Sequence, residues 1–433
     1  MVLVFWLSVA VVAYVYLAYP ILLAVCALIR RSPDRLRQGY GGPPTLHAKA
    51  ERLARGFQPS VVELPSVSIV IAARNEGPRL AERIDNLLRL DYPADKRQII
   101  VVSDGSTDNT LDVLARYGRL VDAVTVPRGG KSLALNAGVA RARHEILLFA
   151  DARQVFASDA MRELVAPFAD PTVGAVTGEL LLDAESPCRR TGADRRRSAR
   201  SAARVVRRRG LDDVEAGRTI GSGPDRRGGT DRRRTLRSTI ADGVGLYWKY
   251  EKQLRRLESA IDSTLGATGA IYAMRRALYR PLPADTLLDD VLTPMRVVLA
   301  GYRVVFNERA RAFDRAAMDA DAEVRRKIRT LAGNYQILAL EPRLLSPRRN
   351  RVWLQYLSHK VGRLVVPYAM LAMFAASLVL AATHPFYLVV LGAQIGLYLL
   401  AGCGALIEYR ARLADGRFAA RQRTLPPPLR EPA

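Results

Sequence analysis

Between Val67 and Leu182, apolar runs of strand length alternate with polar segments of helix length. The apolar runs start at Val67, Gln98, Glu145 and Val173, and the segments between them predict helices over 79–90, 108–117, 131–142 and 158–166. Strands that alternate with helices favour a mostly parallel sheet that helices cover on both faces. The pattern therefore predicts an α/β fold for this part of the chain.

Acidic side chains stand where the predicted strands end. Glu76 follows the first run, Asp104 ends the second, and Asp151 follows the third. Ligands of open α/β sheets bind beyond the carboxyl ends of the strands. Three acids at such ends predict a nucleotide site that also holds a cation.

Two other stretches are apolar enough to cross a bilayer. Residues 1–29 hold no charged side chain, and residues 364–407 hold no Asp, Glu, Lys or Arg and are interrupted at Pro385. A span needs about 20 apolar residues, so the first stretch predicts one transmembrane helix and the second predicts two. No Lys or Arg precedes the first run, which disfavours a signal peptide. Arginines follow the first and last spans, which predicts an outside amino terminus and a cytoplasmic α/β domain and carboxyl terminus.

The order of these segments predicts the domain organisation. It comprises a transmembrane helix (1–29), a linker (30–65), the first half of the α/β domain (66–185), an Arg-rich disordered insert (186–236), the second half of the domain (237–342), an interfacial helix (343–363), two transmembrane helices (364–407) and a cytoplasmic tail (408–433). An amphipathic helix over Gly245–Ser259 could line an acceptor groove, lie at the membrane or pack into the core, which is the default.

The net charge of +24 raises the question of whether the protein binds nucleic acid. Residues 189–234 hold 16 Arg and 6 acidic residues, so this stretch supplies +10 of the total. It contains no aromatic side chain on which bases could stack, which argues against a nucleic-acid partner. Three cysteines and four scattered histidines form neither a disulfide framework nor a metal-ligand spacing.

Five motifs together resemble family 2 glycosyltransferases. They are Ala-Arg-Asn-Glu76, Ser-Asp104-Gly-Ser-Thr-Asp, Gly-Gly-Lys131-Ser-Leu-Ala-Leu-Asn136-Ala-Gly138, Phe-Ala-Asp151-Ala and Asp289-Asp290. The layout is similar to that of the membrane-anchored synthases of cellulose, chitin, hyaluronan and poly-N-acetylglucosamine. The resemblance covers roughly residues 65–182 and 240–345 and the carboxy-terminal span pair. It implies a GT-A-like nucleotide-sugar-binding domain beside the three transmembrane helices.

The resemblance also implies roles on the donor side. Glu76 and Asp104 would lie at the nucleoside, and Lys131 at a helix start would suit phosphate. Asp151 matches the first acid of the Asp-x-Asp motif, which binds Mg²⁺ or Mn²⁺ at the sugar diphosphate. The second acid is absent because position 153 is arginine. One carboxylate and two phosphates can hold the cation with waters, or Arg153 can supply positive charge directly.

Chemistry is expected from the second half. Asp290 matches the last acid of the Thr-Glu-Asp motif, the general base of inverting transfer. Asp289 would support it, although Thr286-x-x-Asp289 also resembles a capping box. Gly269, in the loop before the next strand, is a further predicted substrate contact. Arg326 and Arg329 stand where the family has Gln-x-x-Arg-Trp, with Arg329 expected near the diphosphate, whereas Thr330 replaces the Trp of processive synthases.

The resulting hypothesis is an inverting hexosyltransferase of the inner membrane that uses a nucleoside diphosphate sugar, in particular a UDP-sugar, at a cytoplasmic active site. Its acceptor would be a polysaccharide or a lipid such as a polyprenyl phosphate or a ceramide-like alcohol. Three spans are few for a secretion channel, so export would need a membrane partner or an oligomer. The contrasting hypothesis is a non-catalytic membrane scaffold or a nucleic-acid-binding protein. The presence of Asp104, Asp151 and Asp290 favours the enzyme.

Overall fold

The computed structural model describes residues 1–30, 64–183, 249–315 and 320–423. The predicted linker and Arg-rich insert fall almost entirely outside these ranges. The chain forms two compact units, one of residues 22–356 and one of residues 1–21 with 357–433. Each unit is described by itself.

The larger unit is built on one eight-stranded sheet with the order β3-β2-β1-β4-β7-β6-β8-β5. The strands are β1 (Val67–Ala73), β2 (Arg97–Asp104), β3 (Asp122–Val126), β4 (Ile146–Ala150), β5 (Val155–Phe156), β6 (Val173–Asp183), β7 (Ile271–Arg275) and β8 (Arg303–Arg315). β1 pairs in parallel with both β2 and β4, whereas β7 runs antiparallel between β4 and β6. The sheet is therefore mixed but mostly parallel, as the sequence predicts.

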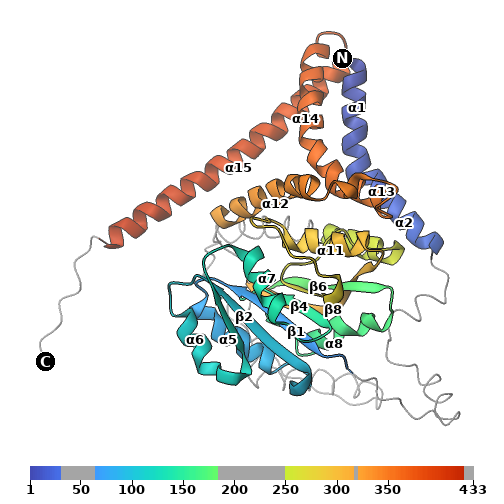
Figure 1. Cartoon of the computed structure of the whole chain (residues 1–433). Coiled ribbons are helices and arrows are strands. Elements are labelled where there is room, and N and C mark those ends of the chain that lie inside the picture. Colours follow the sequence, from blue (N-terminus) through green and yellow to red (C-terminus); the bar gives the residue numbers. More distant parts are fainter. Residues whose placement is uncertain (31–63, 184–248, 316–319, 424–433) are drawn as a thin grey trace, which may run out of the picture. The chain divides into compact units, whose positions relative to one another are not determined.

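Helices lie along this sheet (Figure 1). They are α5 (Gly77–Leu88), α6 (Thr110–Tyr117), α7 (Lys131–Arg141), α8 (Ala160–Val165) and α11 (Asp289–Leu299). The same unit also holds a helical stretch over 249–261 and α12 (Ala320–Leu340), which Figure 1 draws farther from the sheet than α11. α5, α6 and α8 share one core with alternate residues of β1, such as Ile69 and Ile71. α7 packs on the other residues of β1, because a Cβ at Gly138 would lie 2.5 Å from Val70. Both faces are thus covered, as predicted.

Prolines explain two boundaries that differ from the sequence prediction. α5 starts at Gly77 rather than 79, because Pro78 stands in its first turn, where a missing N–H costs nothing. α8 ends at Val165, and a 3₁₀ turn containing Pro167 continues to Ala169. Both differences stay within about two residues, the usual uncertainty of a helix end.

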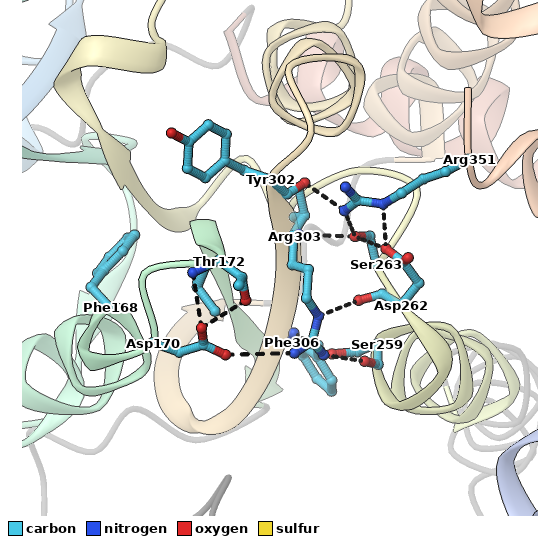
Figure 2. A network of polar contacts seen from close by, with 12 residues as sticks. Phe168, Asp170, Thr172, Ser259, Asp262, Ser263, Tyr302, Arg303, Phe306 and Arg351 are labelled. Atoms are coloured by element: carbon cyan, nitrogen blue, oxygen red, sulfur yellow. Dashed lines mark hydrogen bonds and ion pairs between the residues drawn. The ribbon is translucent and has the colours of Figure 1, made fainter. Parts of the chain in front are cut away.

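A polar network fastens the second half of the sheet (Figure 2). Arg303, at the start of β8, donates to the carbonyls of Asp262 (3.1 Å) and Ser259 (3.3 Å) and faces Asp170 at 3.8 Å. Arg351 donates to Asp262 Oδ1 (3.0 Å) and to the Tyr302 carbonyl (2.7 Å). Two arginines therefore hold the end of the helix over 249–261 and the segment around residue 351 against β8.

The predicted single interfacial helix over 343–363 does not form as one element. Pro342–Leu345 is a 3₁₀ turn, and continuous helix begins only at Trp353. Pro347 lies between them and lacks the N–H that a helix interior needs. Leu344, Val352 and Tyr356 are buried, so part of this segment belongs to the core of the larger unit.

Three helical segments are long and apolar enough to cross a membrane: Val2–Ile29, Trp353–Leu380 and Pro385–Ile407. Only 17%, 28% and 11% of their most apolar windows are buried, so most of their apolar side chains face outward. In the smaller unit, α1 (Val2–Ala13) packs on α14 (Gly362–Leu380). The Phe5 ring meets Tyr387 edge-on, with ring centres 5.1 Å apart, at the start of α15 (Pro385–Arg423).

Candidate functional site

The three predicted acidic strand ends lie side by side. Glu76 follows β1, Asp104 ends β2 and Asp151 follows β4, and β1 is the middle strand of these three. Because β2 and β4 both pair in parallel with β1, all three carboxyl ends open on the same edge of the sheet. The structure therefore brings these residues together, while their individual roles stay predictions.

Asp104 fixes the loop before α7. Its carboxylate is buried, and Oδ1 accepts hydrogen bonds from the amides of Gly129 (2.6 Å) and Gly130 (3.1 Å). Oδ2 accepts a further one from Gly130 at 3.0 Å. Gly130 has a φ of +89°, which favours glycine over other residues. Asp104 thereby sets where Lys131, the first residue of α7, begins.

The rest of the Asp104–Asp108 motif binds the start of α5. Asp108 Oδ2 accepts from the Gly77 amide at 3.1 Å, and the Thr110 hydroxyl accepts from the Glu76 amide at 3.1 Å. Asn75, at a positive φ of 53°, accepts from the Thr107 amide at 2.9 Å. These contacts hold Glu76 next to the end of β2 and explain why the motif carries small polar residues.

Lys131 lies between two acids. Its ammonium is 3.3 Å from Asp151 Oδ1 and 3.2 Å from Asp289 Oδ1. The Lys131 side chain is 39% exposed, so desolvation disfavours the charged ammonium less than full burial would, and the carboxylates of Asp289, Asp151 and Asp290 raise the pKa of Lys131. Lys131 therefore stays protonated and joins the first half of the domain to α11.

Asp289 is not a helix cap. It is the first residue of α11, the cap position belongs to Leu288, and no side chain caps the helix. The Thr286 hydroxyl instead donates to the Pro283 carbonyl at 2.7 Å, so the capping-box interpretation is wrong. Asp289 is 5% exposed. Its Oδ2 has no hydrogen-bond partner among the described residues.

Asp290 is held by the loop before β7. Its carbonyl accepts from the Ala267 amide at 2.7 Å. A Cβ at Gly269 would lie 2.9 Å from Asp290 Oδ2, so only glycine leaves this carboxylate its present place. Gly269, predicted as a substrate contact, thus lies directly against the predicted base.

Glu76 and Arg153 influence each other electrostatically. Burial raises the pKa of Glu76, Arg79 and Arg153 lower it, and Asp151 raises it again. Arg153 is exposed and lies two residues after Asp151 in the same segment. The edge of the sheet therefore holds a mixture of charges, with Arg79 beside Glu76 and Lys131 beside Asp151.

Arg326 and Arg329 lie on α12, where both side chains are exposed. This helix is fastened next to the site, because Gln336 accepts from the Leu287 amide at 2.9 Å and donates to the Asp285 carbonyl at 3.0 Å. α12 therefore abuts the segment that leads into Asp289. A phosphate role for the two arginines stays a prediction.

A divalent cation fits this site only in part. Among the described residues, no three His, Cys, Asp or Glu side chains cluster as a metal site. Asp151 is 28% exposed and can offer a hard oxygen ligand, but Lys131 shares it and position 153 is arginine. A donor set of one carboxylate requires that a diphosphate and water supply the remaining ligands.

An aromatic cluster around Phe149, on β4, is not apparent from the sequence. The rings of Tyr272 and Tyr279 both stack with that of Phe149, with ring centres 4.8 and 5.9 Å from it. The Tyr272 hydroxyl is buried without a hydrogen-bond partner among the described residues. Burial, and then the Asp289 carboxylate, raise the pKa of Tyr272. Aromatic residues in strand and turn positions give no sequence signal beyond that of ordinary core.

Residues 68–216 match the family described as Glycosyl transferase family 2. This stretch of the chain is therefore similar to family 2 glycosyltransferases. The chain is 35% identical over 123 residues to a beta-monoglucosyldiacylglycerol synthase of Synechocystis, covering 27% of this chain and 26% of that protein. It is 32% identical over 123 residues to a poly-beta-1,6-N-acetyl-D-glucosamine synthase of Staphylococcus aureus, covering 28% and 29%. The chain thus spans little more than a quarter of the length of these relatives.

A solved structure extends the likeness of the fold. A mannosyltransferase from Pyrobaculum calidifontis, in complex with GDP-mannose and Mn²⁺, matches 87% of this chain and 92% of its own. The TM-score is 0.53 and the sequence identity is 21%. The match supports the GT-A-like fold that the resemblance to family 2 glycosyltransferases implies.

Proposed function

We propose that this protein is a membrane-bound inverting glycosyltransferase that uses a nucleoside diphosphate sugar. The observation that carries the proposal is the position of Lys131, whose ammonium lies 3.3 Å from Asp151 and 3.2 Å from Asp289 at the carboxyl edge of the sheet. A fixed cation beside a helix start suits the diphosphate of a donor. The neighbouring Asp290 supplies a carboxylate for the acceptor.

In this proposal, the donor lies along the edge from β2 to β4. Glu76 and Asp104 stand at the nucleoside end, and Asp104 also orders the amides of Gly129 and Gly130. Lys131 neutralises the diphosphate, with Arg153, Arg326 and Arg329 as further cations. A divalent cation would add neutralising charge there when bound, and Asp151 is the residue that would hold it.

Asp290 would act as the general base. It takes the proton of an acceptor hydroxyl as that oxygen attacks the anomeric carbon of the sugar. The bond from this carbon to the diphosphate breaks, and the diphosphate leaves with the bonding electrons, next to Lys131. Attack opposite the leaving group inverts the anomeric configuration. Gly269 leaves room for the Asp290 carboxylate during this step.

The acceptor is proposed to be a glycan or a lipid. The two relatives are named as synthases of a glucosyldiacylglycerol and of a poly-N-acetylglucosamine, and the Staphylococcus enzyme's product is a polysaccharide of an amino sugar. Three apolar helices support an enzyme that works at a membrane. The basic residues that follow the spans support a cytoplasmic site facing nucleotide sugars.

A screen of labelled nucleotide sugars tests this function. Purified full-length protein, with membrane lipid extract as the acceptor source, is incubated with UDP-glucose, UDP-N-acetylglucosamine and GDP-mannose. Release of the nucleoside diphosphate together with label in a glycan or lipid product supports the proposal. Absence of both from every donor, in protein that is folded by circular dichroism, would refute it.

A further inference from the structure

Arg83, on α5, is a buried cation with no carboxylate within ion-pair distance among the residues that the structure describes. Its side chain is 1% exposed, and its Nη1 donates to Asn86 Oδ1 at 2.9 Å. Nε and Nη2 have no hydrogen-bond partner in the part of the chain that the structure describes. The guanidinium lies over the Phe156 ring, 3.9 Å from its centre. Buried charges are ordinarily paired, so this arrangement requires an explanation.

The contacts of Arg83 lead to the segment that presents Asp151. Phe156, under the guanidinium, ends the segment that starts at Asp151. Asn86, which receives the hydrogen bond of Arg83, also holds the Phe156 backbone, accepting from its amide at 2.8 Å and donating to its carbonyl at 3.0 Å. Arg83, Asn86 and Phe156 thus form one unit that fixes the far end of the segment that starts at Asp151.

The middle of the same segment is fixed from inside the fold as well. Gln154 is 2% exposed, and its Nε2 donates to Asp314 Oδ2 at 2.9 Å. The segment therefore has two buried anchors, Gln154 and Phe156, and one partly exposed acid, Asp151. These two anchors therefore restrict the position of Asp151 at the other end of the segment.

Electrostatics agrees with this geometry. Burial lowers the pKa of Arg83 to about 9, and the carboxylate of Asp151 acts in the opposite direction. Arg83 therefore remains protonated at pH 7, and the Asp151 carboxylate interacts with it electrostatically. A neutral side chain of the same length would avoid the desolvation cost of the buried charge.

We propose that Arg83 is a positioning residue for Asp151: its buried guanidinium anchors the 151–156 segment through Phe156 and Asn86 and places a fixed positive charge behind the site. This inference rests on the proposed function, in which Asp151 faces the donor diphosphate. Arg83 does not touch the donor; it acts through the segment that it supports.

The test compares Arg83→Met, which keeps an unbranched apolar stem and removes the charge, with Arg83→Lys, which keeps the charge. Calorimetry on the full-length protein in detergent measures the affinity for UDP and for GDP, each with MnCl₂. We expect Arg83→Met to weaken the affinity of whichever nucleotide binds by roughly tenfold, the effect of about 1.4 kcal/mol. The nucleotide affinity of Arg83→Lys should stay within about threefold of that of the parent protein, which corresponds to about 0.7 kcal/mol. The thermal midpoint of Arg83→Met should not fall, because a buried charge is removed.

Arg275→Met is the matched control. The Arg275 guanidinium also lies over a ring, that of Phe168 at 5.4 Å, but it donates to the carbonyls of Val173 and Phe168. Its loss should lower the thermal midpoint and leave nucleotide affinity unchanged. Should Arg83→Met fail to fold, Arg83→Gln takes its place.

Three outcomes are informative. Weak binding by Arg83→Met with recovery by Arg83→Lys supports the proposal. Parent-like binding by Arg83→Met, or equal weakening by both variants, overturns it. If the parent protein binds neither nucleotide, the proposed function itself is contradicted. That result is distinct from one that contradicts only the role of Arg83.

Discussion

The ammonium of Lys131 lies 3.2 Å from Oδ1 of Asp289, although 158 positions separate the two residues in the sequence. Lys131 begins α7 and Asp289 begins α11. Their contact joins the first half of the domain, which carries the nucleotide motifs, to the second half, which carries the predicted base. Asp289 therefore serves as an ion-pair partner of Lys131 rather than as a helix cap.

This contact separates the expected effects of two neighbouring acids. Asp290→Asn should keep donor affinity and slow transfer by roughly 10²–10⁴-fold, because the amide cannot take the acceptor proton. Asp289→Asn should instead weaken donor affinity, because Lys131 loses its nearer anion. Nucleotide calorimetry and single-turnover transfer rates measure the two effects. Normal turnover by Asp290→Asn would place the base elsewhere.

Asp104→Asn distinguishes two roles of that residue. The asparagine amide would face the N–H groups of Gly129 and Gly130, so we expect a stability loss of about 1–3 kcal/mol in urea unfolding. If Asp104 orders this loop for the diphosphate, affinities for UDP and for pyrophosphate should fall together. A change in the preference for UDP over GDP, with pyrophosphate affinity intact, would show instead that Asp104 contacts the base.

Glu76→Gln should stabilise the protein at neutral pH. Burial raises the pKa of Glu76 above its ordinary value of 4.5, so the folded state binds the proton more tightly than the unfolded state. Folding stability therefore falls as pH rises through the range from 4.5 to the raised folded value, and the loss persists above it. Thermal midpoints should differ at pH 7 and converge below the unfolded pKa. Equal differences at both pH values would show that the charge is not the cause.

Arg153→Asp restores the second acid of the Asp-x-Asp pattern. With an additional hard oxygen ligand, we expect Mn²⁺ to increase UDP affinity by a larger factor than in the parent protein. Asp151→Ala should remove most of the Mn²⁺ effect. Arg116→Asp, an equal charge change at an exposed position on α6, is the control. An unchanged Mn²⁺ effect in Arg153→Asp would separate position 153 from the cation.

The membrane orientation can be measured directly. Reporter fusions after Arg37 and after Arg423 should both report cytoplasm, because arginines follow the first and last spans. A periplasmic signal at either position would remove the access of the site to cytoplasmic nucleotide sugars. The orientation is thus a condition of the proposed function.

Local pattern was sufficient for much of the fold. Strands β1, β2, β4 and β6 and helices α5 to α8 lie where alternating apolar runs predict them, because each depends on its own residues and on burial of one face. The acids that end these strands follow from the same pattern, since parallel strands end at one edge. The three apolar helices follow from length and composition alone.

Tertiary structure decided what the side chains do. Asp104 has a motif position but gains its partners, Gly129 and Gly130, only when β2 and the α7 loop meet. Asp289 has the spacing of a cap, yet Lys131 lies near enough to take it as an ion-pair partner. Arg83 occupies an apolar face of α5 between Leu80 and Leu87, and only the packing of Phe156 shows why a cation can stay there. Such contacts join residues far apart in the chain, and no local periodicity encodes which distant group a charged side chain will meet.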